Sequence, residues 1–517
     1  MQREQALSVL QDHTDWDVIV IGGGATGLGV ALEAVARGYS TLLLEQSDFA
    51  KSTSSKSTKL VHGGVRYLAQ GNVALVREAS VERGLLYQNA PHLVRNQAFI
   101  IPVYNWIDRL KYTIGLKLYD WIAGRLSLGS SVFISRQETL ERLPGIKAQG
   151  LIGGVLYHDG QFDDSRLAVN LAQTIYDKGG YAINYIAVKG LLKKEGKVAG
   201  VIAVDAESGS SFPLNAKAVV NATGVFVDNI LHMDNPNAGK SICVSQGVHL
   251  VLDKSFYPAD NALMIPKTSD GRVLFAVPWH NKVVVGTTDT QVETVTLEPV
   301  ALEEEIKFIL NTAGQYLSRE PQRKDVLSVF AGLRPLAAPQ EGSSKTKEIS
   351  RSHKIMVTPS NLFTIIGGKW TTYRKMGEDM LASIEKTLGW NTTHTHTPHL
   401  AIHGYAVNKD WEDPFYFYGS DAAKIRMQMN DNPITWISES LHIHEVQVRW
   451  AVQYEMARTL EDVLSRRTRA LLLDAKESLR IAKPVAEIMA KAMNKDEAWV
   501  NKQVEDYAAI AKNYLLN

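Results

Sequence analysis

One stretch near the start of the chain, residues 16–46, limits the fold more than any other part of the sequence. It reads "WDVIVIGGGATGLGVALEAVARGYSTLLLEQ" and predicts a strand over 17–21, a helix over 25–37 and a second strand over 41–45. Two apolar strands joined by a helix form a parallel βαβ unit, whose crossover is almost always right-handed. The chain is therefore predicted to begin with an α/β layer.

A glycine pattern between the first strand and the helix indicates a nucleotide site. Gly22, Gly24 and Gly27 form G-x-G-x-x-G, with Ala25 and Thr26 between the last two, and Glu45 ends the second strand. In dinucleotide-binding domains such glycines let the backbone approach a pyrophosphate at the helix N-terminus, and the acid binds a ribose. A glycine turn without a ligand is the alternative. The strand, helix and acid together favour a dinucleotide, either NAD or FAD.

Composition and charge narrow the class of protein. The chain of 517 residues is 45% hydrophobic and 21% charged, with a formal net charge of +1. This is ordinary globular composition, and a net charge near zero gives no overall electrostatic attraction to nucleic acid.

The single cysteine, Cys243, allows no internal disulfide. No apolar run is long enough to span a bilayer, and the first residues match neither a secretory signal nor a transit peptide.

The rest of the pattern divides the chain into a mixed region and a helical end. Helices are predicted over 73–89 and 104–126, and a strand–turn–helix over 362–388. Strands are predicted near 153–157, 181–186, 197–205 and 216–221, and as hairpins over 247–290. The segment "NTTHTHTPH" (391–399) has the composition of a linker, and the pattern from about 405 onward is amphipathic and helical.

Three further segments accompany the glycine pattern. The polar stretch "SSKSTKLVHGGVRYL" (54–68) follows the βαβ unit, "AKAVVNATG" (216–224) is a strand ending in a small-residue turn, and "LFTIIGGKWTTYRK" (362–375) is a strand ending in a glycine turn. This three-part arrangement resembles FAD proteins of the glutathione reductase-like superfamily, in which the last glycine turn brings another helix N-terminus to the cofactor.

Over nearly its whole length the chain resembles the FAD-dependent, membrane-associated and quinone-reducing glycerol-3-phosphate dehydrogenases. The segments that carry this resemblance include the glycine pattern, the polar stretch, "YHDGQFDDSRL", "NATGVFVD", "LFAVPWHNKVVVGTTDT", "AGLRPL", "GGKWTTYRKM" and "TLEDVLSRRTRA". The His-Gly-Gly-x-Arg-Tyr-Leu and Gly-Gly-Lys-x-Thr-Thr-Tyr-Arg blocks are the most specific, because many flavoproteins share the first glycine pattern.

The resemblance implies an α/β FAD-binding Rossmann-like domain, an inserted antiparallel-sheet substrate domain and a C-terminal all-α domain. The expected FAD-binding domain is discontinuous, over 14–90, 148–240 and 350–390. The expected substrate and membrane-facing domain comprises 91–147 and 241–349, and the helical domain comprises 400–517.

The resemblance also implies the cofactor contacts and the reaction. A hydride passes from glycerol 3-phosphate to FAD, the product is dihydroxyacetone phosphate, and the electrons pass to a membrane quinone. The implied FAD contacts are Gly22, Gly24, Ala25, Thr26, Gly27, Glu45, Ser54, Ser55, Ser57, Lys59, His62, Gly63, Gly64, Ala222, Thr223, Gly224, Gly367, Gly368, Lys369 and Thr371.

The substrate carries a phosphate and a secondary hydroxyl, and arginine's planar fork suits the phosphate. The family motifs place Arg66, Tyr67 and Arg351 near the phosphate, and Arg334 and Lys369 nearer the hydroxyl and the flavin. For each arginine the plain alternative is an ordinary ion pair.

A base must take the hydroxyl proton, and histidine is the natural candidate near neutral pH. His62 and His249 are the two candidates, and an arginine that stabilises a developing alkoxide is the alternative.

Residues 104–126 place Ile107, Leu110, Ile114, Leu118 and Trp121 on one helical face, flanked by Arg109, Lys111, Lys117 and Arg125. This pattern is typical of an interfacial amphipathic helix, and a core-facing helix looks the same in outline. The family favours membrane contact. The expected location is therefore the cytoplasm, peripherally bound to the inner face of the cell membrane, and a homodimer stays open.

Two charged segments receive structural interpretations. In "YHDGQFDDSRL" (157–167), Asp163 or Asp164 is expected to cap a helix over 165–177, so no metal site is predicted. In "TLEDVLSRRTRALLLD" (459–474), a helical cap with internal ion pairs is favoured over nucleic-acid binding.

Two rival functions are retained. One is a glycerol-3-phosphate oxidase that uses oxygen. The other is a flavoprotein that senses redox state or binds nucleic acid without turnover.

Overall fold

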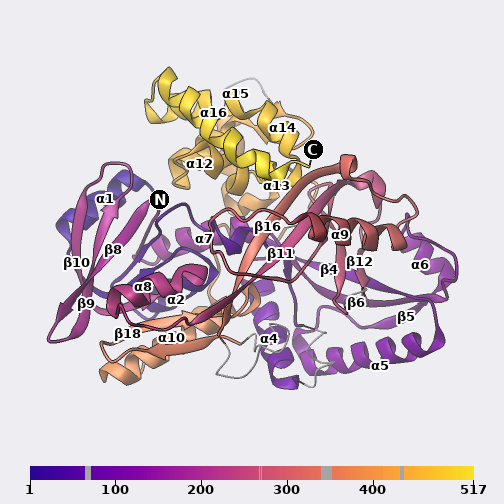
Figure 1. Ribbon diagram of the computed structural model, residues 1–517, viewed down its shortest axis with the longest axis horizontal. Helices are drawn as coiled ribbons and strands as arrows, with labels where there is room; N and C mark the ends of the chain where they lie inside the picture. Colours follow the sequence, from indigo (N-terminus) through magenta and orange to yellow (C-terminus); the bar gives the residue numbers. More distant parts are fainter. Residues whose placement is uncertain are drawn as a thin grey trace.

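The structure is a computed structural model and describes residues 1–64, 72–266, 268, 271–338, 352–408, 410–430 and 436–516. Two sheets stand side by side beneath a group of helices (Figure 1). Helices cover the first sheet, and the second sheet is built mostly from antiparallel strands. The predicted class, a Rossmann-like domain with an inserted sheet and a C-terminal helical part, is confirmed.

The first sheet contains the predicted βαβ unit. β1 (Asp15–Ile21), α2 (Ala25–Ala36) and β2 (Thr41–Leu44) follow one another, and β1 pairs in parallel with both β2 and β10 (Ser211–Asn221). Buried residues run almost continuously along β1 and β2, as expected for parallel strands covered on both faces. The other elements of this part are α1 (Arg3–Asp12), α7 (Asp164–Asp177), β7 (Tyr181–Ile183), β8 (Ile186–Lys194), β9 (Lys197–Asp205), α8 (Val227–Asp234), β17 (Lys354–Val357), β18 (Leu362–Ile366) and α10 (Tyr373–Leu388).

The second sheet is longer than the sequence pattern predicted. Its main path runs β15–β11–β14–β13–β12–β4–β6–β3, with β16 beside β11 and β5 beside β6. These strands are β3 (Leu60–Val61), β4 (Val94–Val103), β5 (Val132–Ser135), β6 (Gly153–Phe162), β11 (Ile242–Asp253), β12 (Ala262–Ile265), β13 (Leu274–Trp279), β14 (Lys282–Gly286), β15 (Thr290–Val292) and β16 (Val326–Ala337). Its helices are α4 (Val73–Asn89), α5 (Trp106–Ala123), α6 (Arg136–Arg142) and α9 (Glu303–Tyr316).

One predicted boundary needs correction. We assigned residues 148–240 to the FAD-binding domain, but β6 pairs with β4 along its whole length, from Val94 opposite Phe162 to Val103 opposite Gly153. β3, also assigned there, pairs with β6. Both strands therefore belong to the second sheet, because their hydrogen-bond partners are in it.

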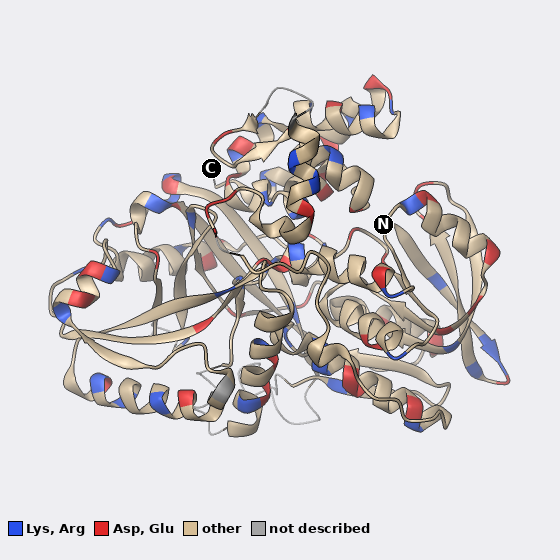
Figure 2. Cartoon of the chain, turned by 180° about the vertical axis from the view of Figure 1, so that it is seen from behind, with Lys and Arg blue, Asp and Glu red and all other residues tan. Residues whose placement is uncertain are grey.

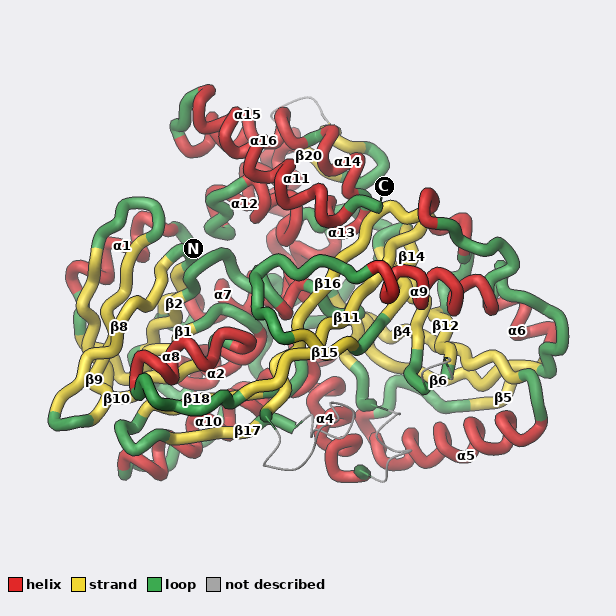
Figure 3. The backbone as a smooth tube through the Cα atoms, viewed as in Figure 1, coloured by secondary structure: helices red, strands yellow, loops and turns green. Residues whose placement is uncertain are grey.

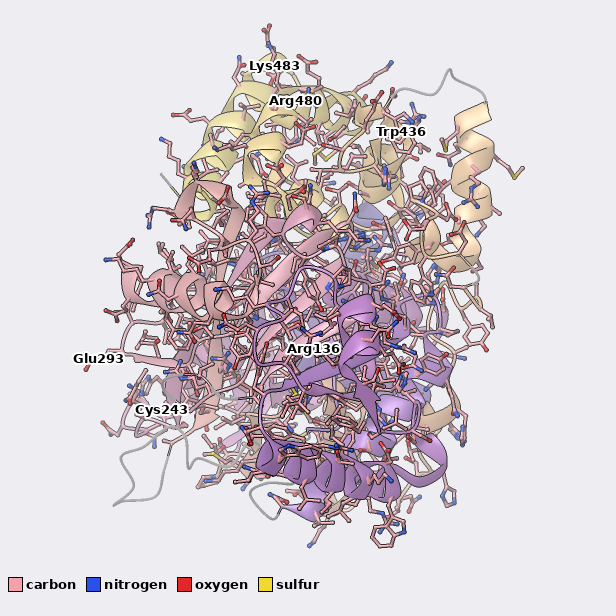
Figure 4. All side chains as sticks on the ribbon, turned by 90° about the vertical axis from the view of Figure 1, so that its right-hand side faces the viewer. Arg136, Cys243, Glu293, Trp436, Arg480 and Lys483 are labelled. Atoms are coloured by element: carbon pink, nitrogen blue, oxygen red, sulfur yellow. The ribbon has the colours of Figure 1, made fainter. Side chains whose placement is uncertain are left out.

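The C-terminal part is mainly helical and packs on the second sheet (Figure 3). Its elements are α11 (Ala422–Asn430), β19 (Trp436–Ser438), β20 (Ile443–His444), α12 (Glu445–Tyr454), α13 (Ala470–Leu473), α14 (Ala475–Arg480), α15 (Ala482–Met493) and α16 (Glu497–Ala511). Trp279 and Phe330 of the sheet belong to the same buried cluster as its helices. Arg480 and Lys483 lie on its outer side, away from the sheets (Figure 4). Helical structure begins later than predicted, because 405–408 and 410–415 have turns and irregular backbone and a 3₁₀ segment (Tyr416–Asp421) follows.

The segment 391–399 is tied to the first domain, although its composition is typical of a linker. Thr393 donates a hydrogen bond to Glu385 at 2.6 Å, and the buried Thr397 donates one to Glu33. Its hydroxyls therefore hold the chain against α2 and α10 instead of leaving it free.

The arginines of segment 459–474 form ion pairs, but not only the internal ones that we expected. Arg466 and Arg467 both reach Asp48, at 2.5 and 2.6 Å, and Arg469 reaches Asp163 at 3.0 Å. All five side chains are buried. Burial would raise the pKa of Asp48, but Arg467 and Arg466 outweigh it and hold the pKa well below its usual range. These charges join the C-terminal helices to the first domain.

Asp48→Asn is therefore expected to destabilise the protein strongly. Removing one partner of a buried ion pair costs about 3–5 kcal/mol, because the remaining charge stays buried without compensation. Urea unfolding followed by circular dichroism measures the change. Asp506→Asn is the control, since Asp506 makes an exposed pair with Lys502 at 3.0 Å and should change stability by less than about 1 kcal/mol. Equal unfolding midpoints for the two variants would contradict this account.

Candidate active site

A cavity of about 480 Å³ opens between the two sheets. Its wall comes from the turn after β1, the polar stretch, the turn after β10, the facing strands β11 and β16, and the glycine turn before α10. The sequence predicted most of these segments separately, and the fold brings them to one enclosure. Predicted site residues that line it are Gly22, Gly24, Ala25, Thr26, Glu45, Ser54, Ser57, His62, Ala222, Thr223, Gly224, His249, Arg334, Gly367, Gly368, Lys369 and Thr371.

The first glycine turn packs too closely for any larger residue. A Cβ atom on Gly27 would lie 1.8 Å from the carbonyl oxygen of Gly22, and one on Gly22 would lie 2.6 Å from that of Ala222. Gly27 is not among the lining residues, so its role is to let α2 approach β1. The N-terminus of α2 thereby points its positive dipole end at the cavity.

Glu45 lies at the end of β2, beside this turn. Its two carboxylate oxygens accept hydrogen bonds from the backbone N–H groups of Gly23, at 2.6 Å, and Ser47, at 2.8 Å. Burial raises the pKa of Glu45, and these two hydrogen bonds oppose the rise. A carboxylate offers about four acceptor positions, so Glu45 keeps capacity for ribose hydroxyls. The glycine turn, the helix N-terminus and this acid fit a dinucleotide.

The polar stretch divides into residues that line the cavity and residues that hold its shape. Ser54 accepts a hydrogen bond from the Ala25 N–H at 3.0 Å, and its carbonyl oxygen accepts one from the Trp370 indole at 2.7 Å. Lys59 is fully buried and does not line the cavity, because its ammonium donates to both oxygens of Asp164 at 2.8 Å and to the Ser55 carbonyl at 2.7 Å. Lys59 therefore shapes the stretch.

The predicted FAD contacts Ser55, Gly63 and Gly64 also lie off the cavity wall. The Gly63 N–H donates to Asp159 at 3.3 Å, and a Cβ atom at Gly63 would lie 2.3 Å from the Tyr119 hydroxyl. That hydroxyl in turn donates to Asp159 at 3.0 Å and accepts a hydrogen bond from Arg83 at 3.0 Å. Tyr119 belongs to α5, so this helix contacts the backbone next to His62.

His249 lies on β11 with its ring buried in the cavity wall. Its Nε2 shares a hydrogen bond with the Thr58 hydroxyl at 2.9 Å, and its ring stacks on Phe330 with centroids 4.9 Å apart. Its Nδ1 is buried without a hydrogen-bond partner among the described residues. Burial, followed by the positive charges of Arg334 and Lys59, lowers the pKa of His249 well below 6.5. The ring is therefore neutral at pH 7.

Arg334 extends from β16 across β11. Its guanidinium donates to the Thr287 hydroxyl at 3.0 Å and to the Thr288 carbonyl at 3.1 Å, and it lies 3.7 Å from a carboxylate oxygen of Asp289. A Cβ atom on Gly247 would lie 2.1 Å from its Nη2, so only glycine leaves room for this placement. A fixed guanidinium, a neutral imidazole and a lysine, Lys369, thus face one space.

Three predicted substrate contacts, Arg66, Tyr67 and Arg351, lie outside the described residues. Several lining residues were not among our predicted site residues: Lys51, Lys56, Thr58, Asn229 and Trp370. Thr58 and Lys56 stand within the quoted polar stretch and Trp370 within the "GGKW" motif, so their position in these motifs was the available signal.

The acidic segment has the structural role that we favoured. Asp163 caps α7 by accepting a hydrogen bond from the Arg166 N–H at 3.1 Å, and Asp164 pairs with Lys59. Within the described ranges, no group of three or more His, Cys, Asp or Glu side chains is placed to hold a metal ion.

α5 lies along an outer edge of the second domain (Figure 1), and the side chains of its apolar stripe are exposed. Ile107 is 80% exposed, Leu110 64% and Trp121 78%, whereas Leu116 and Tyr119 on the opposite side are buried. Lys and Arg residues recur along the helix (Figure 2). The core-facing alternative is therefore wrong. No helix in the described part of the chain is long and apolar enough to cross a membrane.

The chain matches two protein families. The family described as FAD dependent oxidoreductase matches residues 17–371, and the C-terminal domain of alpha-glycerophosphate oxidase matches residues 364–500.

Among curated proteins, the chain is similar to the mitochondrial glycerol-3-phosphate dehydrogenases of Homo sapiens and Schizosaccharomyces pombe. The first is 38% identical over 544 residues, which cover 97% of this chain and 74% of that protein. The second is 34% identical over 581 residues, which cover 99% and 89%.

Among solved structures, the glycerol-3-phosphate dehydrogenase from Bacillus halodurans complexed with FAD matches with a TM-score of 0.79 and 28% identity, over 99% of this chain and 97% of that one. The L-alpha-glycerophosphate oxidase from Mycoplasma pneumoniae with FAD bound matches with a TM-score of 0.56 and 16% identity, over 75% and 98%. The second likeness concerns the fold alone.

Proposed function

Because the chain belongs to the family of FAD-dependent glycerol-3-phosphate dehydrogenases, we propose that it oxidises sn-glycerol 3-phosphate to dihydroxyacetone phosphate and passes the electrons to a membrane quinone. FAD is the cofactor, and it supplies the acceptor for the hydride when bound. The observation that carries the proposal is that one cavity joins a dinucleotide turn to a cluster of Arg334, Lys369, His62 and His249.

The cofactor end of the cavity is the glycine turn with its helix. We assign the pyrophosphate to the N-terminus of α2 and the ribose to Glu45. The second and third turns, 222–224 and 367–371, close the same cavity from β10 and from the start of α10. Residues of these three turns would therefore hold the cofactor.

The substrate end holds the cations. Arg334 is held in place by Thr287, Thr288 and Asp289, so its guanidinium needs no reorganisation to bind a developing alkoxide. Lys369 faces the same space. Arg66, Tyr67 and Arg351 remain our proposed phosphate contacts from the family motifs. Hydrogen bonds to a charged phosphate contribute about 1.5–3 kcal/mol each.

His62 is our proposed proton acceptor, and His249 our proposed neutral partner of the substrate hydroxyl. Both line the cavity. Protonating His249 would place a third positive charge beside Arg334 and Lys59 in a buried site, which disfavours it as the base. Its bond to Thr58 orients the ring without a change of charge.

An anaerobic titration of the purified protein with glycerol 3-phosphate tests the reaction. We expect the visible absorbance of the flavin to bleach as substrate is added, because the hydride reduces the cofactor. An unchanged flavin spectrum would refute glycerol 3-phosphate as the substrate without contradicting the fold. It is the result expected for the rival function, a flavoprotein that senses redox state or binds nucleic acid without turnover. A soluble quinone analogue added under nitrogen should then restore the absorbance.

The oxidase remains the second candidate, because the C-terminal match is to a domain of alpha-glycerophosphate oxidase. Admitting air after bleaching separates the two. Reoxidation that is faster in air than with the quinone analogue would favour oxygen as the acceptor.

The pH dependence of kcat/KM tests the proton acceptor. With His62 as base, kcat/KM falls toward acidic pH, because the base must be deprotonated. His62→Gln should remove this acidic limb and lower kcat about 10²–10⁴-fold, whereas His249→Gln should keep the limb. The substrate phosphate ionises near pH 6, so the variants are compared with each other. If the acidic limb is lost in His249→Gln but kept in His62→Gln, His249 and not His62 is the proton acceptor.

The exposed stripe of α5 supports the proposed membrane quinone as acceptor. A helix with apolar side chains outward and cations beside them binds at the surface of anionic membranes, where a quinone is available. We therefore propose a peripheral location on the inner face of the cell membrane. A homodimer is compatible with this arrangement.

Replacing Ile107, Leu110 and Ile114 together by Asn is expected to abolish membrane binding, since it removes the exposed apolar area. Cosedimentation with phosphatidylglycerol vesicles measures this, and we expect at least a tenfold loss. Val407→Asn with Met427→Asn is the matched control, because these residues are 67% and 69% exposed elsewhere. Equal cosedimentation of the two variants would exclude α5 as the membrane contact.

A further inference from the structure

A second cavity of about 210 Å³ lies where the second sheet meets the C-terminal part. Its walls come from the start of β4, the end of β6, the turn between β13 and β14, and the segment 411–417. Arg95, Trp411, Tyr416 and His280 are the lining residues that carry the argument. Neither the glycine turns nor Arg334 reach it, so it is separate from the first cavity.

Arg95 is the unusual cation of this cavity. Its Nε donates to the Gln161 side chain and its Nη2 donates to the Pro278 carbonyl at 3.2 Å. Its guanidinium carbon lies 5.9 Å from the centre of the Trp411 ring. Among the described residues, no carboxylate oxygen lies within 4.0 Å of its nitrogens.

The other cations that line the cavity are each paired with an acid. Arg469 lies 3.0 Å from Asp163, Lys254 lies 3.0 Å from Asp260, and Lys282 lies 3.3 Å from Asp253. Arg95 therefore differs from its neighbours. It holds a charge in a mostly buried position with only neutral partners in contact.

Such burial is costly unless an anion arrives. Burial lowers the pKa of Arg95. Tyr416, Asp260 and Glu412 oppose this lowering by electrostatic interaction, without a hydrogen bond to the guanidinium. The cost of burying an unpaired cation falls when an oxyanion accepts bidentate hydrogen bonds from the guanidinium.

We propose that this cavity binds a small oxyanion, a carboxylate or a phosphate ester, with Arg95 as the principal contact and the rings of Trp411 and Tyr416 as walls. Its volume is below the range of about 300–1,000 Å³ typical of larger ligands, so a ligand of three or four carbons fits it. His280 supports the wall, because its ring stacks on Tyr416 with centroids 5.9 Å apart and its Nε2 bonds to Asp163 at 3.3 Å.

Adjacent residues connect this cavity to the first one. Asp163 faces His280 and Arg469, and the next residue, Asp164, holds Lys59 beneath the polar stretch. The first turn of α7 thus contacts the wall of the second cavity through Asp163 and supports the polar stretch of the first cavity through Asp164.

Calorimetric titration of the full-length holoprotein tests the site, with inorganic phosphate in one arm and malonate in the other. We expect Arg95→Gln to weaken binding at this cavity at least tenfold and to remove one site from the stoichiometry. Binding of phosphate alone identifies a phosphate ester as the ligand class, and binding of malonate alone identifies a carboxylate. Wild-type and Arg95→Gln titrations that coincide in both arms would overturn the proposal.

A location-resolved measurement and two further variants accompany the titration. Crystals soaked in sodium selenate should show an anomalous peak between Arg95 and Trp411, and a wild-type cavity without a peak would also overturn the proposal. Arg142→Gln is the control, because Arg142 makes an exposed pair with Glu138 at 2.9 Å and should leave binding unchanged. Arg95→Lys keeps the positive charge but loses the planar guanidinium that makes two hydrogen bonds to an oxyanion, so we expect its affinity to lie between those of the wild type and Arg95→Gln. This variant also provides a test if Arg95→Gln folds poorly. The KM for glycerol 3-phosphate should not change in any of these variants.

Discussion

Buried ion pairs join the C-terminal part to the first domain, and a neighbouring pair holds the polar stretch in place. Asp48 from the first domain binds Arg466 and Arg467, Asp163 at the start of α7 binds Arg469, and Asp164 beside it binds Lys59. Each charge is costly to bury alone, so loss of either partner would leave the other buried without compensation. The geometry of the cavity wall depends on these contacts.

Local sequence patterns predicted the parts of the fold that depend on neighbouring residues. The alternation of apolar strand, glycine turn and helix over 17–45 fixed the βαβ unit, since each element follows from its own periodicity. The stripe over 107–121 likewise placed the apolar face of α5 correctly, although only the structure shows that this face is exposed. The capping role of Asp163 followed from its position before a helical pattern.

Patterns of this kind could not predict contacts between distant segments. Lys59 looked like a cofactor contact from its motif, but its partner Asp164 is 105 residues away in sequence, and the contact exists only in the folded chain. The partner of Arg467 is 419 residues away, so the ion pairs of segment 459–474 appeared internal. β6 was assigned to the wrong sheet for the same reason, because its apolar run fits either sheet and its register with β4 decides.

The contact between Tyr119 and Gly63 has a consequence for how the surface of this protein can vary. A surface helix usually has a face on which most substitutions are neutral. α5 has little such freedom, because its inner face supports the backbone beside His62 through Tyr119, Asp159 and Arg83, and its outer face carries an exposed apolar stripe. Substitutions on the inner face therefore alter the support of the backbone beside His62 as well as helix stability, and substitutions on the outer face alter the exposed apolar surface.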